Sequence, residues 1–136
     1  MTYAGDLTPS EAYDLVRENP DAVLVDVRTT AEWEQIGIPD LSEIGQEVAL
    51  IEGQQYPTGS INPDFAAELQ EVVHEGAPVL MICRSGVRSI AAAEAATQAG
   101  IGPAYNVLEG FEGRVDAFGR RGSTGWRAAG LPWRQQ

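Results

Sequence analysis

The chain has 136 residues, of which 43% are apolar and 21% are charged, and its formal net charge is −11. This length suits one domain over residues 1–136, and the composition is that of an ordinary globular protein. The strong acidity argues against nucleic acid as a partner. No apolar stretch approaches the roughly 20 residues that a membrane-spanning helix needs, so we expect no membrane partner.

Cys83 is the only cysteine in the chain, which excludes an internal disulfide and a resolving cysteine within one molecule. The amino-terminal residues lack the basic and apolar regions of a signal peptide. A chain without disulfides suits a reducing compartment, so we expect a cytoplasmic location.

The first predicted elements are a helix, a strand and a second helix. Residues 8–11 form a Thr-Pro-Ser-Glu capping box with proline at the first helical position, which predicts a helix to about Glu18. Residues 22–27 are apolar apart from Asp26 and predict a strand buried on both faces, as in a parallel sheet. A short helix is expected at about 30–35.

The middle of the chain is the least regular part. Residues 37–61 predict a long loop with one helical turn near 41–44, and loops of this length tend to be functional or mobile. Residues 62–64, Asn-Pro-Asp, then predict the start of a helix that runs to about Glu75 and is closed by Gly76.

The second half repeats the alternation of strand and helix. We expect a strand at 78–82, a helix at 90–99 and a third strand at 104–108. Residues 110–136 are expected to pack a short helix and then to follow the surface. This alternation predicts an α/β fold with a mostly parallel central sheet flanked by helices.

Cys83 stands directly after the second predicted strand and before a glycine turn that leads into a helix. This order places the sulfur at a helix amino terminus, where free N–H groups and the helix dipole favour an anion. The same field favours the reactive thiolate over the thiol. Arg84 and Arg88 in the same loop add positive charge. We therefore predict that Cys83 is a nucleophile in an anion-binding loop.

A buried core thiol is the alternative interpretation of Cys83, because free cysteine is among the most buried residue types. The two arginines in its turn argue against that interpretation. Asp26 lies in an apolar strand and needs a partner, for which Arg28, Arg88 and the loop N–H groups are candidates. We expect Asp26 and Arg28 to brace the fold.

His74 is the only histidine, and it precedes the second strand whereas Cys83 follows it. A strand of about five residues spans roughly 17 Å, so a catalytic Cys-His pair is not expected. No cluster of residues has the spacing of metal ligands, and we expect neither a metal nor a cofactor.

Four segments of the chain resemble the rhodanese-like domain. They are Val-Asp-Val-Arg at 25–28, Glu-Trp at 32–33, Cys-Arg-Ser-Gly-Val-Arg-Ser at 83–89 and Asn-Val-Leu-Glu-Gly-Phe at 106–111. They occur in the family's order, and the resemblance covers about residues 8–133. It implies a three-layer fold and a sulfurtransferase whose cysteine becomes a persulfide. The sulfur comes from a donor and passes to an acceptor such as cyanide or a thiol.

Two departures from the family pattern fall on loops. Residues 37–39, Gly-Ile-Pro, lack the histidine of the family's usual stretch, and a second partial match lies at 59–62. The simplest interpretation is an insertion of residues 40–58. The tryptophan that usually follows the glycine-rich turn corresponds to Trp126, displaced by residues 116–125.

The loop chemistry follows from its residue types. Backbone N–H groups can surround a terminal sulfur, Gly86 permits the tight curl, and Ser89 can cap the following helix and donate to the sulfur. Arginine forks suit sulfonate-like oxygens, which favours thiosulfate over mercaptopyruvate as the donor. The predicted catalytic residue is Cys83, and the predicted substrate-binding residues are Arg84, Ser85, Gly86, Val87, Arg88 and Ser89.

Two other functions use a similar loop. Cysteine phosphatases and arsenate reductases need five residues between cysteine and arginine, whereas four lie between Cys83 and Arg88. A non-catalytic persulfide carrier or sulfur-sensing interaction module would form the same persulfide and stays open. The expected partners are a small anionic sulfur donor and a thiol or cyanide acceptor. A protein sulfur acceptor also stays open.

Overall fold

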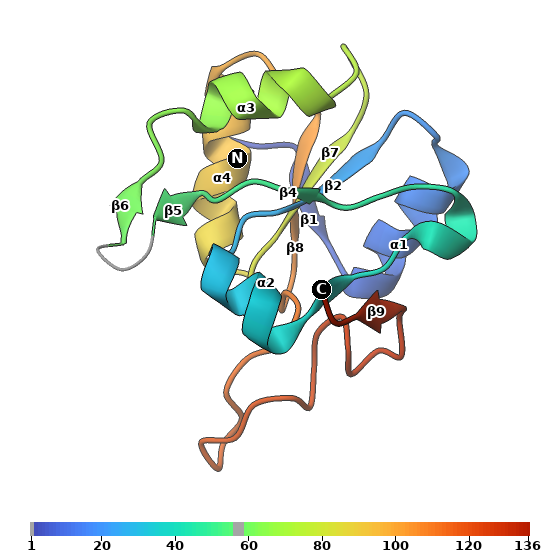
Figure 1. Ribbon diagram of the computed structural model, residues 1–136, viewed down its shortest axis with the longest axis vertical. Coiled ribbons are helices and arrows are strands. Elements are labelled where there is room, and N and C mark those ends of the chain that lie inside the picture. The colour runs from blue at the N-terminus through green and yellow to red at the C-terminus, as the bar shows by residue number, and fades with distance from the viewer. Residues whose placement is uncertain (1, 56–58) are drawn as a thin grey trace.

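The computed structural model describes residues 2–55 and 59–136, and its centre is a five-stranded sheet (Figure 1). The strand order is β1-β8-β7-β2-β4, and every neighbouring pair is parallel. β7 lies in the middle and is buried along its whole length, as expected for a nearly continuous apolar run. The strands span β1 Gly5–Leu7, β2 Val23–Asp26, β4 Ala49–Leu50, β7 Val79–Ile82 and β8 Ala104–Val107.

Helices cover both faces of this sheet, which confirms the predicted three-layer α/β fold. α3 (Phe65–Val72) and α4 (Arg88–Gln98) pack on the face to which Val25 and Met81 point. α1 (Pro9–Glu18) packs on the other face, against Leu24 and Leu80. Successive residues of β2 and β7 thus feed two separate cores, because side chains of a strand alternate between faces.

The first two helices begin with the same device. In α1 and in α2 (Thr30–Ile36), a threonine before the helix and a glutamate three residues later exchange hydrogen bonds with each other's backbone. The pair Thr8–Glu11 confirms the predicted start of α1, which also ends at Glu18 as predicted. The pair Thr29–Glu32 was not recognised in the sequence.

Residues 37–61 carry more structure than the predicted loop. The predicted helical turn is present as η1 (Ser42–Ile44), and β4 adds an edge strand to the central sheet. β5 (Gln54–Gln55) and β6 (Ser60–Ile61) form a small antiparallel pair. β3 (Ile38–Pro39) belongs to a second antiparallel pair, with a strand near the carboxyl terminus. Strands of two residues are too short to show a periodic pattern in the sequence. Residues 56–58 of the predicted insertion lie outside the described residues.

One further strand, one helix end and one helix cap differ from the predictions. β1 was missed, and it extends the sheet by pairing with β8. α3 ends at Val72 rather than near Glu75, and Asp64 makes no side-chain capping bond. Instead, the Asn62 side-chain oxygen accepts a hydrogen bond from the Asp64 N–H at 3.0 Å.

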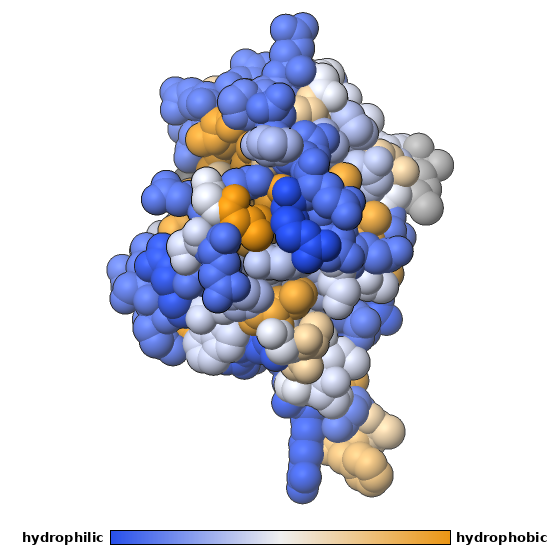
Figure 2. All heavy atoms as spheres, turned by 90° about the vertical axis from the view of Figure 1, so that its right-hand side faces the viewer, coloured by the Kyte–Doolittle hydropathy of each residue, from blue (hydrophilic) through white to orange (hydrophobic). Residues whose placement is uncertain are grey.

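The carboxyl-terminal tail contains turns and one short strand. The predicted helix within residues 110–136 is wrong, and β9 (Trp133–Arg134) pairs antiparallel with β3. Trp126 is fully buried and packs with α1. The loop between β8 and β9 projects from the body of the molecule at the bottom of both views (Figure 1, Figure 2). None of the helices in the described part of the chain is long and apolar enough to cross a membrane.

Candidate active site

Cys83 lies at the carboxyl edge of the sheet, in its middle. It follows the last residue of β7, and residues 84–87 form a loop that enters α4 at Arg88. The neighbouring strand β2 is in register, with Asp26 opposite Ile82. The predicted position of Cys83, directly after a strand of the parallel sheet, is confirmed. Ligands of open parallel sheets bind at this edge.

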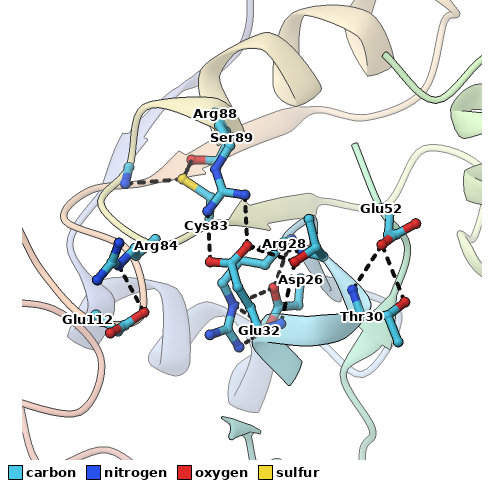
Figure 3. A network of polar contacts seen from close by, with 12 residues as sticks. Asp26, Arg28, Thr30, Glu32, Glu52, Cys83, Arg84, Arg88, Ser89 and Glu112 are labelled. Carbon is cyan, nitrogen blue, oxygen red and sulfur yellow. Dashed lines mark hydrogen bonds and ion pairs between the residues drawn. The ribbon is translucent and has the colours of Figure 1, made fainter. Parts of the chain in front are cut away.

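The Cys83 sulfur is buried but has polar neighbours. The residue is 1% exposed, as a core thiol would be. Its Sγ accepts a hydrogen bond from the Gly86 N–H at 3.2 Å and lies 3.2 Å from Ser89 Oγ (Figure 3). Of the predicted ring of loop amides, only Gly86 donates to Sγ within the described chain. The sulfur therefore has two polar neighbours, although the residue also belongs to the apolar cluster on this face of the sheet.

Gly86 gives the loop its curl. Its φ is +89°, in the left-handed region that side chains with a Cβ resist. A Cβ at this position would also lie 2.7 Å from the Glu109 nitrogen and 3.3 Å from the Val107 oxygen. The loop thus packs directly on the segment that follows β8, and glycine is required for both conformation and space.

Ser89 belongs to a buried hydrogen-bond chain and does not cap α4. The helix begins after Val87, which makes no side-chain capping bond, so the predicted capping role is wrong. The Ser89 hydroxyl donates to Asn106 Oδ1. Asn106 Nδ2 donates in turn to Asp6 Oδ1 at 3.1 Å and to the Gly86 oxygen at 3.3 Å. Because Asp6 Oδ1 and the Gly86 oxygen can only accept, the nitrogen of the Asn106 amide faces them and its oxygen faces Ser89.

This chain determines what Ser89 can offer to the sulfur. A serine hydroxyl has one hydrogen, and Asn106 already accepts it. Ser89 Oγ therefore presents lone pairs to Cys83, and the thiol hydrogen is the donor in their contact. The expected donation from Ser89 to the sulfur requires this hydroxyl to turn away from Asn106.

Arg88 is held by a carboxylate of α2. Its Nη1 and Nη2 bind the two oxygens of Glu32 at 2.9 Å each. Burial alone would raise the pKa of Glu32, but the hydrogen bonds from Arg88 and from the Thr29 backbone outweigh it and lower that pKa. The hydrogen bond with Glu32 raises the pKa of Arg88. The pair therefore stays ionised, with the two charges matched (Figure 3).

Arg84 is paired as well. Its Nε lies 3.1 Å from Glu112 Oε2, and Arg127 approaches the same carboxylate at 3.8 Å. Both predicted arginines thus lie at the loop, but the expected excess of positive charge is compensated by Glu32 and Glu112. Their part in donor binding stays a prediction.

The buried ion pair of Asp26 and Arg28 holds together the segments that surround the site. Both side chains are fully buried, and Arg28 binds the two Asp26 oxygens through Nε at 2.9 Å and Nη2 at 2.7 Å. Nη2 also donates to the Gly37 oxygen at 2.7 Å, and the guanidinium lies 4.3 Å from the centre of the Phe111 ring. Of the three predicted partners of Asp26, Arg28 is the correct one, and this pair joins three segments of the chain.

Three further residues considered in the sequence analysis are Val87, Ser85 and His74. Val87 is exposed and Ser85 partly buried, and both lie in the loop. His74 is exposed and precedes β7, at the opposite end of that strand from Cys83. No three His, Cys, Asp or Glu side chains gather in a way that could hold a metal, within residues 2–55 and 59–136.

Sequence reasoning missed the network residues around the loop, which are Asp6, Asn106 and Glu112, and did not recognise the role of Glu32. Asn106 had a readable signal, since it is a polar residue inside a buried strand. Glu32 also had one, because it stands three residues after Thr29.

Comparisons with known proteins agree with this architecture. A model of the Rhodanese-like domain family matches residues 8–117. An uncharacterized protein of Rickettsia conorii is 35% identical over 130 residues, which covers 94% of this chain and 95% of that protein. The crystal structure of Rv0390 from M. tuberculosis is 57% identical with a TM-score of 0.91, and covers 98% of this chain and 99% of that one.

A more distant structure shares the fold. The polysulfide-sulfur transferase homodimer from Wolinella succinogenes is 23% identical with a TM-score of 0.65. The match covers 99% of this chain and 80% of that one. At this identity the likeness concerns the fold alone.

Proposed function

Because the chain belongs to the rhodanese-like domain family, we propose that it is a sulfurtransferase with Cys83 as its nucleophile. It takes a sulfane sulfur from thiosulfate or a similar anionic donor and passes it to cyanide or a thiol. The observation that carries this proposal is the contact of Sγ with the Gly86 N–H, in a curled loop at the carboxyl edge of the sheet. The polysulfide-sulfur transferase is an example of sulfur transfer on this fold, and the reaction class proposed for this chain rests on its family membership.

The first step is attack on the donor. The Cys83 thiolate attacks the outer sulfur of thiosulfate, the S–S bond of the donor breaks, and sulfite leaves with the bonding electron pair. The product is a persulfide on Cys83. Its terminal sulfur lies about 2 Å beyond Sγ, and we expect the loop N–H groups to surround it there.

Ser89 serves the anionic forms of the site. Once Cys83 has lost its proton, no hydrogen remains between Sγ and Ser89 Oγ, which are 3.2 Å apart. We expect the hydroxyl then to turn from Asn106 to the sulfur, because a charge-assisted hydrogen bond is stronger than a neutral one. In the second step the acceptor attacks the terminal sulfur, and the Cys83 thiolate leaves.

Mass spectrometry tests the nucleophile directly. Incubation with thiosulfate should add about 32 Da, one sulfur atom, to the protein and nothing to Cys83→Ala. Sulfite release in the presence of cyanide should then show steady-state turnover. If thiosulfate adds no sulfur to the parent protein, Cys83 does not act as the nucleophile.

A non-catalytic persulfide carrier is the second candidate, and the burial of Cys83 favours it. A sulfur that is 1% exposed can hold a persulfide without releasing it to small molecules in solution. Persulfide formation with no turnover, with cyanide or small thiols, would support the carrier. In that case the acceptor is a protein.

A further inference from the structure

A cavity of about 320 Å³ lies beside the Cys83 loop. Its volume is at the lower end of the range of small-molecule sites in proteins. One wall comes from residues 53–54 and 61–63, and the others come from α3 and α4. The lining is mostly apolar and includes Ile61, Phe65, Ala66, Ala91, Ala92 and Ala95.

The floor of this cavity reaches Val27, the strand neighbour of Cys83, although Cys83 itself is not among the lining residues. Val27 lines the cavity, and its N–H donates to the Ile82 oxygen at 2.9 Å. The paired strands β2 and β7 continue by one residue, so Val27 stands beside Cys83 at a strand spacing of about 4.8 Å. Both residues belong to the same buried cluster and hence to the same face of the sheet.

Arg88 places one cation at the edge of this apolar space. It lines the cavity, and its pKa is raised mainly by the hydrogen bond with Glu32, with a smaller contribution from the nearby Cys83. Of the five N–H donors of a guanidinium, the described residues take two, both through Glu32. The remaining donors can face a bound anion.

The wall formed by residues 53–54 and 61–63 is tied to its neighbours by hydrogen bonds of Asn62. Asn62 is buried, and its N–H donates to the Gly53 oxygen at 3.0 Å. Its side-chain nitrogen donates to the Glu52 oxygen at 2.8 Å and to the Glu68 carboxylate at 3.1 Å. This one residue therefore ties the β5–β6 pair to α3 and fixes the width of the cavity.

We propose that this cavity binds the carbon body of the sulfur acceptor, and that this acceptor is a thiol carried on an apolar group about the size of a benzyl group. The inference rests on the proposed sulfurtransferase activity and names the acceptor class for it. The apolar walls take the carbon body, and the free donors of Arg88 attract the thiolate. Apolar burial supplies affinity, and the N–H donors of Arg88 that Glu32 does not occupy direct the sulfur towards the Cys83 loop, although Glu32 matches the charge of Arg88.

The transfer balances without any further reactant. The acceptor thiolate RS⁻ attacks the terminal sulfur of the Cys83 persulfide and forms a new S–S bond. The bond between that sulfur and Sγ breaks, and Sγ keeps the electron pair as thiolate. The product is the persulfide RSS⁻, and the total charge is unchanged.

The test compares two acceptors in variants that fill the cavity. Ala66→Leu on α3 and Ala91→Leu on α4 each put a larger side chain into the lining. Ala67→Leu is the matched control, because Ala67 is exposed on the same helix and is not among the lining residues. Sulfite release from thiosulfate is measured with phenylmethanethiol and with cyanide, which has no carbon body to accommodate.

We expect kcat/KM for phenylmethanethiol to fall about tenfold in Ala66→Leu and Ala91→Leu, and to stay unchanged in Ala67→Leu. Turnover with cyanide should be the same in all four proteins. An equal loss for both acceptors, or no loss for the thiol, would overturn the assignment. Absence of persulfide on Cys83 with thiosulfate would instead contradict the sulfurtransferase itself.

A binding measurement covers the case in which turnover is absent. Phenylmethanethiol is titrated into Cys83→Ala under reducing conditions, and amide chemical shifts are followed by NMR. Shifts centred on α3, α4 and Asn62 are expected, and they should weaken in Ala91→Leu. Shifts elsewhere, or none, would show that the cavity does not hold this ligand.

Discussion

Glu32 performs two tasks with one carboxylate, because it closes the capping box of α2 and also binds Arg88 beside the sulfur. Glutamine in its place can still accept the capping bond but loses the charge. We expect Glu32→Gln to lower the free energy of unfolding by about 1–2 kcal/mol at neutral pH, after allowance for partial exposure of the pair. Urea unfolding measures this loss. Glu11→Gln is the control, because Glu11 closes the same box in α1 without an arginine partner in the described chain.

The loss should depend on pH in a defined direction. The folded protein lowers the pKa of Glu32 below its ordinary value of 4.5, so the stability from the charged pair is fully present above that value. It disappears as the pH falls through the lowered pKa, because the carboxylate is then protonated in both states. The difference between the parent protein and Glu32→Gln should therefore shrink in acid. A constant difference down to the lowest pH would contradict this account.

The buried pair of Asp26 and Arg28 should respond more strongly to the loss of one partner. Asp26→Ala leaves the guanidinium of Arg28 buried without its carboxylate, and we expect a loss of about 3–5 kcal/mol in the free energy of unfolding. Asp14→Ala removes a partner from the exposed pair with Arg17 and should cost less than about 1 kcal/mol. Similar losses in the two variants would argue against the bracing role.

Single residues show how far the sequence could be interpreted. The position of Cys83 and the curl at Gly86 were predictable from the motif and from turn chemistry, whereas the cost of a buried charge predicted only that Asp26 has a partner, with Arg28 as one of three candidates. The partners of Arg84 and Arg88 were not, since Glu112 and Glu32 are brought to the loop only by folding. An acidic chain offers many carboxylates, and their spacing in sequence does not tell which ones pair.

At the scale of elements, the curl of the loop depends on Gly86. Gly86→Ala adds a Cβ that meets backbone at 2.7 Å, so the loop must shift and the bond from its N–H to Sγ is weakened. We expect the rate of persulfide formation with thiosulfate to fall at least about tenfold, as for the loss of one charge-assisted hydrogen bond. Stopped-flow measurement of sulfite release checks this rate.

Gly119→Ala is a matched control for that substitution. Gly119 also has a left-handed φ, +77°, but a Cβ there meets no atom within 4 Å. Both variants therefore carry the conformational strain of alanine, and only Gly86→Ala carries the crowding. Equal rates in the two variants would show that the loop geometry does not govern the reaction.

Long elements were predictable, whereas strands of two or three residues were not. α1 carries a capping box, proline at its first position and an apolar face, and its bounds matched. β4 has two residues and β1 three, so neither contains enough positions for a pattern. Their place in the sheet comes from pairing with β2 and β8, which is a property of the folded molecule. The missed Asp6 belongs to β1, so the same shortness hid the end of the Ser89–Asn106 chain.

The charge of the whole molecule bears on donor binding. The net charge is −11, and both loop arginines are matched by carboxylates. We therefore expect the protein to repel a dianionic donor at long range. The value of kcat/KM for thiosulfate should rise between about 0.01 M and about 0.15 M salt, where the screening length falls from about 30 Å to about 8 Å.

Alkylation of Cys83 by iodoacetamide is the control for this salt series, because the reagent is uncharged and reaches the same sulfur. Its rate should change little over the same range. A kcat/KM for thiosulfate that falls with salt would show instead that Arg84 and Arg88 attract the donor more strongly than the acidic body repels it. That result would support their predicted part in donor binding.

Cys83 is buried and is the only cysteine of the chain, so its reaction with a thiol reagent reports how often the sulfur becomes accessible. A reagent larger than a water molecule can label Cys83 only while the loop swings aside, and the chain contains no second thiol to confuse the signal. The labelling rate with a bulky fluorescent maleimide thus measures how often the loop moves away from the Cys83 sulfur. Comparison of that frequency with the catalytic rate would show whether chemistry or opening limits turnover.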